Sequence, residues 1–86
     1  REAVRGLLFS AEAVRAARQS SDLARRQLEA EQARYEEGLS TTFQVLQFQS
    51  DLATALSSEV TALGNYAKSM ASLSRAEGRI DEDLSQ

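Results

Sequence analysis

The chain has 86 residues and a net charge of −3 at pH 7, and it contains no cysteine, histidine or proline. The absence of cysteine excludes disulfides and thiolate metal sites, and the absence of histidine removes the commonest metal ligand and general base. Acidic residues accompany the arginines along the chain, so there is no basic stripe of the kind that binds nucleic acid. We therefore expect no cofactor, no metal and no nucleic-acid partner.

No group of side chains in the sequence suggests catalysis. Glu36 and Glu37 are neighbours on a predicted helix, where adjacent side chains point about 100° apart. The serines have no histidine or suitable lysine to activate them. The acidic run 81–83 lacks the spacing and the turn glycine of a calcium loop. We expect a protein that is not an enzyme.

The first predicted element is a helix over residues 1–37. Small and apolar residues follow two stripes along it, each with the alternating three- and four-residue spacing of a heptad seam. The stronger stripe consists of Ala3, Leu7, Ser10, Val14, Ala17, Ser21, Ala24, Leu28, Glu31 and Tyr35. The weaker stripe consists of Phe9, Ala13, Ala16, Ser20, Leu23, Gln27 and Ala30.

A tight turn over residues 38–41 follows. Gly38 is the expected end of the first helix, because glycine adopts the left-handed conformation after a helix without steric cost. Thr41 is the expected N-cap of the next helix, and Gln44 completes the Thr-x-x-Gln pattern of a capping box. A stop and a start so close together predict that the chain folds back on itself.

The second predicted helix covers residues 42–77 and also carries two stripes. We expect it to end at Gly78, and the acidic segment 78–86 to leave the hairpin as a tail. One stripe consists of Leu46, Gln49, Ala53, Leu56, Val60, Leu63, Ala67, Met70 and Ser74. The other consists of Val45, Phe48, Leu52, Ala55, Glu59, Ala62, Tyr66, Ser69, Leu73, Ala76 and Ile80.

The predicted fold is all-α, a long antiparallel two-helix coiled-coil hairpin. At about 1.5 Å per residue the hairpin would be roughly 54 Å long, with almost no interior of its own. Two stripes on each helix predict two packing neighbours for each helix. Both a ring of helices and a four-helix bundle meet that requirement, and the pattern alone gives them equal weight. The stripe containing Glu59 has no other charge, and this favours the ring.

The turn and its flanks resemble the TolC-type outer-membrane efflux channel family. The resemblance rests on the pattern Tyr-x-x-Gly-Leu-x-Thr-x-x-x-Val-Leu-x-x-Gln, and nearly the whole chain takes part. The matching residues are Tyr35, Gly38, Leu39, Thr41, Val45, Leu46 and Gln49. The resemblance implies that Val45, Leu46 and Gln49 have a packing role in this motif.

Members of that family form trimers with an outer-membrane β-barrel that continues into a periplasmic tunnel of helices. Each protomer contributes two hairpin repeats to the tunnel. The resemblance implies that this chain is one periplasmic hairpin, of the second repeat, from a longer Gram-negative outer-membrane protein. Its partners would be the other protomers and the hairpin of a periplasmic adaptor protein, which links the channel to an inner-membrane pump. The adaptor-facing tip would be Gly38, Leu39, Ser40 and Thr41.

The resemblance also implies an entrance at the tip, and here the chain departs from the family's best-known member. Tyr35 matches a tyrosine that helps to hold that entrance shut. Gln44 and Gln47 stand where that member has acidic residues, and Ser40 stands where it has a gating arginine. We therefore expect a neutral, hydrogen-bonding constriction in place of an acidic one.

The function predicted from the sequence is thus a wall and entrance segment of an efflux or secretion channel. The alternative is a structural or signalling coiled-coil hairpin that self-associates into a four-helix bundle. We expect the isolated chain to self-associate in either case, because its unpaired stripes would pack on other copies. The sequence does not indicate which substrate is exported.

Overall fold

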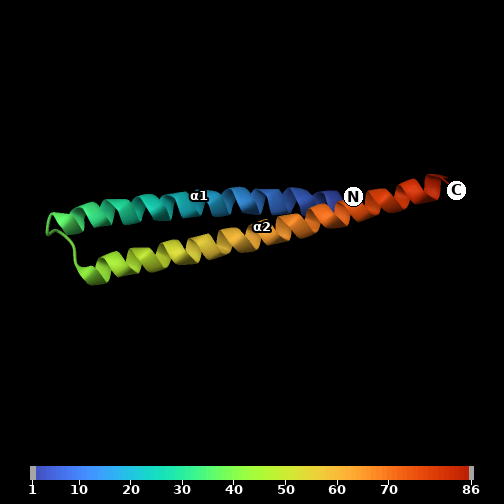
Figure 1. Ribbon diagram of the computed structural model, residues 1–86. Helices are drawn as coiled ribbons and strands as arrows, with labels where there is room; N and C mark the ends of the chain where they lie inside the picture. The colour runs from blue at the N-terminus through green and yellow to red at the C-terminus, as the bar shows by residue number, and fades with distance from the viewer. Residues whose placement is uncertain (1, 86) are drawn as a thin grey trace.

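Two long antiparallel helices joined by a tight turn make up the hairpin (Figure 1). The computed structural model describes the backbone of residues 2–85 and the side chains of residues 2–75. Helix α1 is Glu2–Glu36 and helix α2 is Thr42–Ser85, and no strand occurs in the described part of the chain. The molecule measures 73 × 14 × 14 Å. The predicted all-α hairpin is confirmed.

Helix α1 ends at the predicted glycine. Gly38 has a φ of 77°, the left-handed conformation expected after a helix. The Leu39 amide donates to the Arg34 carbonyl at 2.8 Å, and the Gly38 amide donates to the Tyr35 carbonyl at 3.0 Å. These two bonds form a Schellman motif, which satisfies carbonyl groups that the last turn of a helix leaves unpaired.

Helix α2 begins at the predicted cap. The Gln44 amide donates to the Thr41 hydroxyl oxygen at 3.2 Å, so Thr41 is the N-cap. The second bond of a capping box would run from the Thr41 amide to the Gln44 side chain. Instead, the Gln44 Oε1 atom accepts a hydrogen bond from the Ser40 hydroxyl at 2.9 Å. The glutamine therefore stabilises the turn, while the threonine alone caps the helix.

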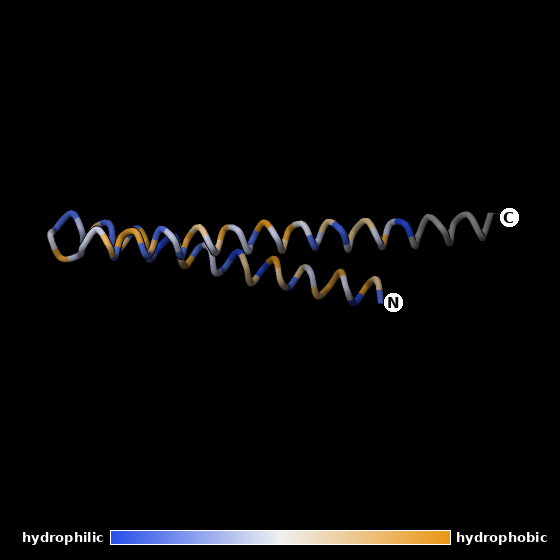
Figure 2. The backbone as a smooth tube through the Cα atoms, turned by 90° about the horizontal axis from the view of Figure 1, so that it is seen from below, coloured by the Kyte–Doolittle hydropathy of each residue, from blue (hydrophilic) through white to orange (hydrophobic). Residues whose placement is uncertain are grey.

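One stripe from each helix forms the contact between them, and we call this contact the seam. On α1 the buried and half-buried residues are those of the stronger predicted stripe, without the exposed Tyr35 and with Ala11 added. On α2 the described ones are those of the stripe that contains Glu59. Hydropathy along the chain shows apolar residues recurring at intervals on both helices (Figure 2). Ala76 and Ile80 of the predicted α2 stripe lie outside the side chains that the structure describes.

Polar contacts cross the seam at two places, among half-buried apolar side chains. The Ser10 and Ser69 hydroxyls lie 2.9 Å apart, and the Ser21 hydroxyl donates to Glu59 Oε1 at 2.7 Å. Among the described residues, the buried apolar ones are only alanines, Ala24 and Ala62. The stripe that contains Glu59 faces α1, and the Glu59 carboxylate bonds across the seam. Its low charge is therefore explained by pairing within the hairpin and does not favour a ring over a bundle. A seam this poor in large buried side chains gives the hairpin little stability of its own.

Helix α2 does not end at Gly78, as the sequence analysis expected, but runs on to Ser85. A glycine inside a helix costs about 1 kcal/mol relative to alanine, which a regular helix can tolerate. No proline follows Gly78, and the backbone does not have to reverse there as it does at Gly38. The end of α2 therefore extends past the start of α1 (Figure 1). The molecule is longer than expected for this reason.

Candidate functional site at the hairpin tip

A hydrogen bond joins the two helices across the turn. The Tyr35 hydroxyl lies 3.1 Å from the Thr42 hydroxyl, so the last turn of α1 is tied to the first residue of α2. Tyr35 is itself 46% exposed, and its ring is therefore at the surface of the tip instead of inside the seam. The structure thus brings this predicted entrance residue into contact with the turn.

Arg34 also holds the turn, and the sequence analysis did not single it out. Its Nη2 atom donates to the Leu39 carbonyl at 3.1 Å, and its Nη1 atom lies 3.6 Å from Glu31 Oε1. The sequence signal for such a residue is a basic side chain in the last turn of a helix, where it can bond to free carbonyls. Arg34 is the basic residue in the last turn of α1.

Glu31 is a buried carboxylate one turn away from the tip. Its side chain is 8% exposed and lies on the seam side of α1. The Oε1 atom has no hydrogen bond within the described part of the chain. Buried carboxylates are uncommon unless they are paired, and this one faces only the guanidinium of Arg34 at ion-pair distance.

Three apolar side chains are exposed at the tip: Leu39 at 62%, Phe43 at 75% and Leu46 at 56%. The sequence analysis named Leu39 and Leu46 but not Phe43. An aromatic residue in the first turn of a helix, directly after the N-cap, could have indicated it. No charged residue occurs from Gly38 to Ser50, so the charges beside this apolar surface come from the end of α1, where Arg34 bonds to the Leu39 carbonyl.

The predicted constriction residues are both exposed on α2. Gln44 accepts a hydrogen bond from Ser40, and Gln47 Nε2 donates to Asp51 Oδ1 at 3.4 Å. Each comes one position before a seam residue in the sequence, Val45 or Phe48, so both lie on the same side of α2. Each side-chain amide therefore bonds to a residue four positions away in the chain, Gln44 to Ser40 and Gln47 to Asp51.

The motif residues on α2 divide between two surfaces. Val45 is half-buried in the seam, as a packing residue should be. Leu46 and Gln49 are exposed, and they begin a stripe that does not contact α1. A packing role for these two residues would need a neighbouring chain.

Each helix keeps one whole stripe exposed. On α1 it is the weaker predicted stripe, which runs from Phe9 to Ala30 and is here called the α1 stripe. On α2 it is the stripe from Leu46 to Ser74, here called the α2 stripe. The α2 stripe contains no charged residue along nine positions. Large apolar side chains left on the surface in such rows mark contact surfaces.

The two exposed stripes lie on opposite faces of the hairpin. Each residue turns a helix by about 100°, and the α1 stripe precedes the seam residues by one position, whereas the α2 stripe follows them by one. The helices are antiparallel. An offset of one position back on α1 and one position forward on α2 therefore rotates the two stripes away from the seam in the same direction, when the hairpin is viewed from one end. The helices face each other, so the same rotation carries the stripes to opposite sides. The hairpin therefore has one apolar stripe on each broad face.

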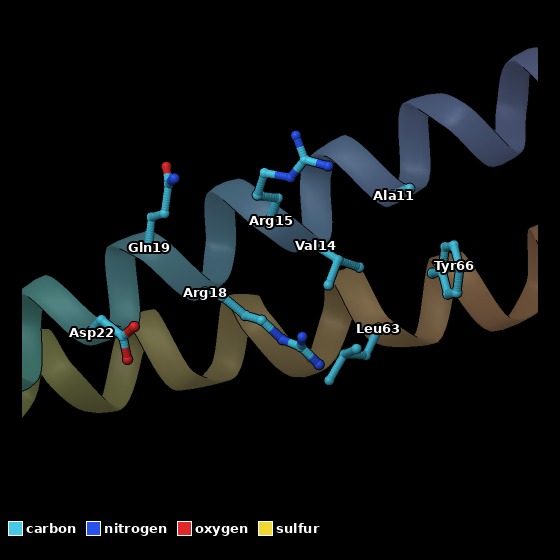
Figure 3. A pocket seen from close by; sticks show the side chains of 8 residues that line it. All are labelled: Ala11, Val14, Arg15, Arg18, Gln19, Asp22, Leu63 and Tyr66. Carbon is cyan, nitrogen blue, oxygen red and sulfur yellow. The ribbon is translucent and has the colours of Figure 1, made fainter.

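A shallow groove of about 420 Å³ runs along the middle of the hairpin, far from the tip (Figure 3). Val14, Leu63 and Tyr66 give it an apolar side, while the polar side includes Arg15 and Arg18. Leu63 belongs to the α2 stripe, so the groove is part of the same exposed face. It is an open groove between the two helices.

The comparison with family models gives one match, to the family of outer membrane efflux proteins, over residues 1–79. Searches of curated proteins and of solved structures gave no match. The family match extends over α1, the turn and most of α2. The chain therefore belongs to the outer membrane efflux protein family, whose members are transport proteins.

Two further observations concern the helices themselves. Neither helix is long and apolar enough, over the residues described, to cross a membrane. The same part of the chain brings no three acidic side chains together in a way that could hold a metal ion.

Proposed function

We propose that the chain is a periplasmic wall and entrance segment of a trimeric outer-membrane efflux or secretion channel. In this proposal the hairpin packs side by side with other hairpins of the channel. Its tip docks the hairpin of a periplasmic adaptor protein, which connects it to an inner-membrane pump. The family match supports a role in an outer-membrane efflux protein. The finer assignments depend on the surfaces described above.

The observation that carries the proposal is the position of the two exposed stripes. A hairpin in a wall needs a contact surface on each of its two sides. A hairpin in a dimeric four-helix bundle needs both of its stripes on one face, because only that face meets the partner. Stripes on opposite faces give the hairpin a contact surface on each side, as a wall needs, and not two stripes on one face, as a dimeric bundle needs. They therefore favour the wall over the self-associating coiled-coil bundle.

The tip supports docking by its exposed apolar side chains. Leu39 and Phe43 lie at the apex, where neither can be covered by the chain's own helices. Large apolar side chains, aromatic ones above all, often carry most of the energy of an interface. The lack of charge from Gly38 to Ser50 makes the surface suited to an apolar contact instead of ion pairing.

The entrance in this proposal is neutral. Gln44 and Gln47 would line it and Tyr35 would help to hold it shut through its bond to Thr42. Amide side chains form hydrogen bonds with water and with each other, and they are neutral, so they do not repel each other as two ionised carboxylates do. We infer that such an entrance would respond little to divalent cations, in contrast to an acidic ring.

The deciding experiment is in-cell crosslinking of the intact parent protein from single cysteines, Leu39→Cys and Ser40→Cys, followed by identification of the captured partner. Ser72→Cys is the matched control, because Ser72 is also exposed but lies far from the tip. We expect a periplasmic adaptor to be captured from the tip and not from the control position. If the tip cysteines capture only other copies of the same protein, the docking proposal is wrong.

A further inference from the structure

Among the side chains described, Glu31 is the buried charged group, and the proposed function does not use it. Its side chain is 8% exposed, and its Oε1 atom lacks a hydrogen bond within the described residues. Placing a carboxylate in such a site is unfavourable, and an apolar residue in the seam would stabilise the helix pair more. The position of Glu31 therefore calls for a reason other than packing.

The only cation near this carboxylate, among the side chains described, is Arg34, and Arg34 is also the residue that holds Leu39. Its Nη1 atom faces Glu31 at 3.6 Å, and its Nη2 atom donates to the Leu39 carbonyl at 3.1 Å. The Arg34 carbonyl accepts the Leu39 amide at 2.8 Å. Both the amide and the carbonyl of Leu39 are thus bonded to the same residue.

We propose that Glu31 and Arg34 are a positioning pair that couples helix pairing to the shape of the tip. Glu31 sits in the seam and orients the guanidinium, and the guanidinium fixes the peptide that presents Leu39. This inference rests on the proposed docking role of the tip. Its new content is that two residues outside the docking surface decide whether Leu39 is presented in the shape that the partner binds.

The coupling depends on burial. While the helices are paired beside the tip, little water surrounds Glu31, and its attraction for the partly exposed Arg34 is screened less than that between two surface groups. If the helices separated there, water and ions would reach the carboxylate and weaken that attraction. The guanidinium would then be free to leave the Leu39 carbonyl. The turn would lose its fixed shape at the same time as the seam opened.

The geometry also requires arginine. The contacts to Glu31 and to Leu39 use different nitrogens of one planar guanidinium, which is a rigid fork. Lysine has a single ammonium group on a flexible stem and cannot hold both positions with the same geometry. Arg34→Lys therefore keeps the positive charge but breaks the connection.

The first test measures the turn and the helix pair separately in the chain itself. Glu31→Met replaces the carboxylate with an apolar side chain of similar length. We expect its midpoint of thermal unfolding to stay the same or rise, while hydrogen exchange of the Leu39 amide, followed by NMR, becomes about threefold faster, on the scale of a partly exposed ion pair. Glu29→Met is the control, because Glu29 is an exposed acid on the same helix. It should leave Leu39 exchange unchanged.

A purely structural role for Glu31 predicts a different result. The unfolding midpoint and the protection of Leu39 would then move in the same direction. Arg34→Lys provides a second variant that keeps the net charge, and it should also speed Leu39 exchange. Unchanged Leu39 exchange in both variants overturns the inference.

The second test connects the pair to docking in the intact parent protein. Crosslinking from Ser40→Cys is compared with and without Glu31→Met, and we expect a severalfold lower yield of captured adaptor in the double variant. If the yield is unchanged while Leu39 exchange is faster, docking does not depend on the turn and the inference is wrong. If Ser40→Cys captures no adaptor even with Glu31 present, it is the docking proposal that fails.

Discussion

At the scale of single residues, replacing a glycine by alanine tests the backbone conformation alone wherever the added methyl group has no neighbour. An added Cβ would meet nothing within 4 Å at Gly38 or at Gly64. The two positions differ in backbone conformation, because Gly38 has a positive φ and Gly64 lies inside α2. Substitution by alanine should therefore have opposite effects at the two sites.

We expect Gly38→Ala to lower the free energy of unfolding by about 1 kcal/mol, the cost of a side chain in the left-handed conformation. Gly64→Ala should raise it by up to about 1 kcal/mol, because alanine is the better helix former. Urea denaturation at one fixed protein concentration measures both. A stabilising Gly38→Ala would contradict the assigned turn.

The bond between Tyr35 and Thr42 gives a second prediction at this scale. Tyr35→Phe removes the hydroxyl but keeps the ring, and it should lower the free energy of unfolding by about 0.5–1 kcal/mol, the usual net value of one hydrogen bond. Tyr66→Phe is the control, because no hydrogen bond of the Tyr66 hydroxyl is seen among the described residues. Equal effects of the two substitutions in urea denaturation would show that the bond across the turn contributes nothing.

At the scale of the helices, the seam is held by polar groups where a coiled coil usually has apolar ones. Glu59 accepts from Ser21 and lies 3.8 Å from the Arg18 guanidinium, whose side chain is largely exposed. The Ser21 hydroxyl also lies 3.1 Å from the Arg18 carbonyl, which is an alternative acceptor for its one proton. Removing the carboxylate therefore leaves Ser21 with a partner, which limits the cost.

We expect Glu59→Leu to stabilise the hairpin by about 1 kcal/mol, because it extends the apolar seam between Ala55 and Ala62. Glu59→Gln should have little effect, because it can still accept from Ser21 and loses only a long ion pair with the largely exposed Arg18 side chain. The urea midpoints of the two variants and the native chain decide this. A destabilised Glu59→Leu variant would mean that the polar contacts hold the helices together more strongly than apolar packing can.

At the scale of the whole molecule, the hairpin is a thin rod with an apolar stripe on each broad face. A molecule 73 Å long and 14 Å thick cannot cover both stripes by itself. Neighbours on both sides would cover them, and the resulting stability would depend on assembly. The isolated chain should self-associate for the same reason.

We expect a charge on either stripe to disrupt the channel without unfolding the hairpin. Leu23→Glu tests the α1 stripe and Val60→Glu the α2 stripe, and both side chains are more than half exposed at 56% and 68%. Ser58→Glu, on the polar side of α2, is the control. Helix content by circular dichroism should stay the same in all three variants of the chain.

In the intact parent protein, native electrophoresis should show fewer assembled channels for both stripe variants and not for the control. A wall needs both faces, so both substitutions should act. If only one of them has an effect, the hairpin uses a single face, as in a bundle.

Much of this architecture could be predicted from local sequence. Gly38 and Thr41 stop and start helices through backbone conformation and hydrogen bonds of adjacent residues, and such effects depend on the residues themselves. The heptad spacing likewise predicted the two stripes that form the seam among the described side chains, except that Tyr35 is exposed and Ala11 is half-buried outside them. The end of α2 was missed because a lone glycine does not stop a helix unless the chain must also turn there.

The sequence by itself determined that this protein is a two-helix hairpin with more contact surface than one chain can use. Only the tertiary structure decided which stripe of each helix faces inward, because both stripes of a helix have the same heptad spacing. That choice depends on groups far apart in the sequence, such as Ser21 and Glu59, whose bond forms only when the helices pair. The roles of Glu31 and Arg34 follow from the same pairing, since a carboxylate becomes buried, and its partner becomes fixed, only once the second helix lies against the first.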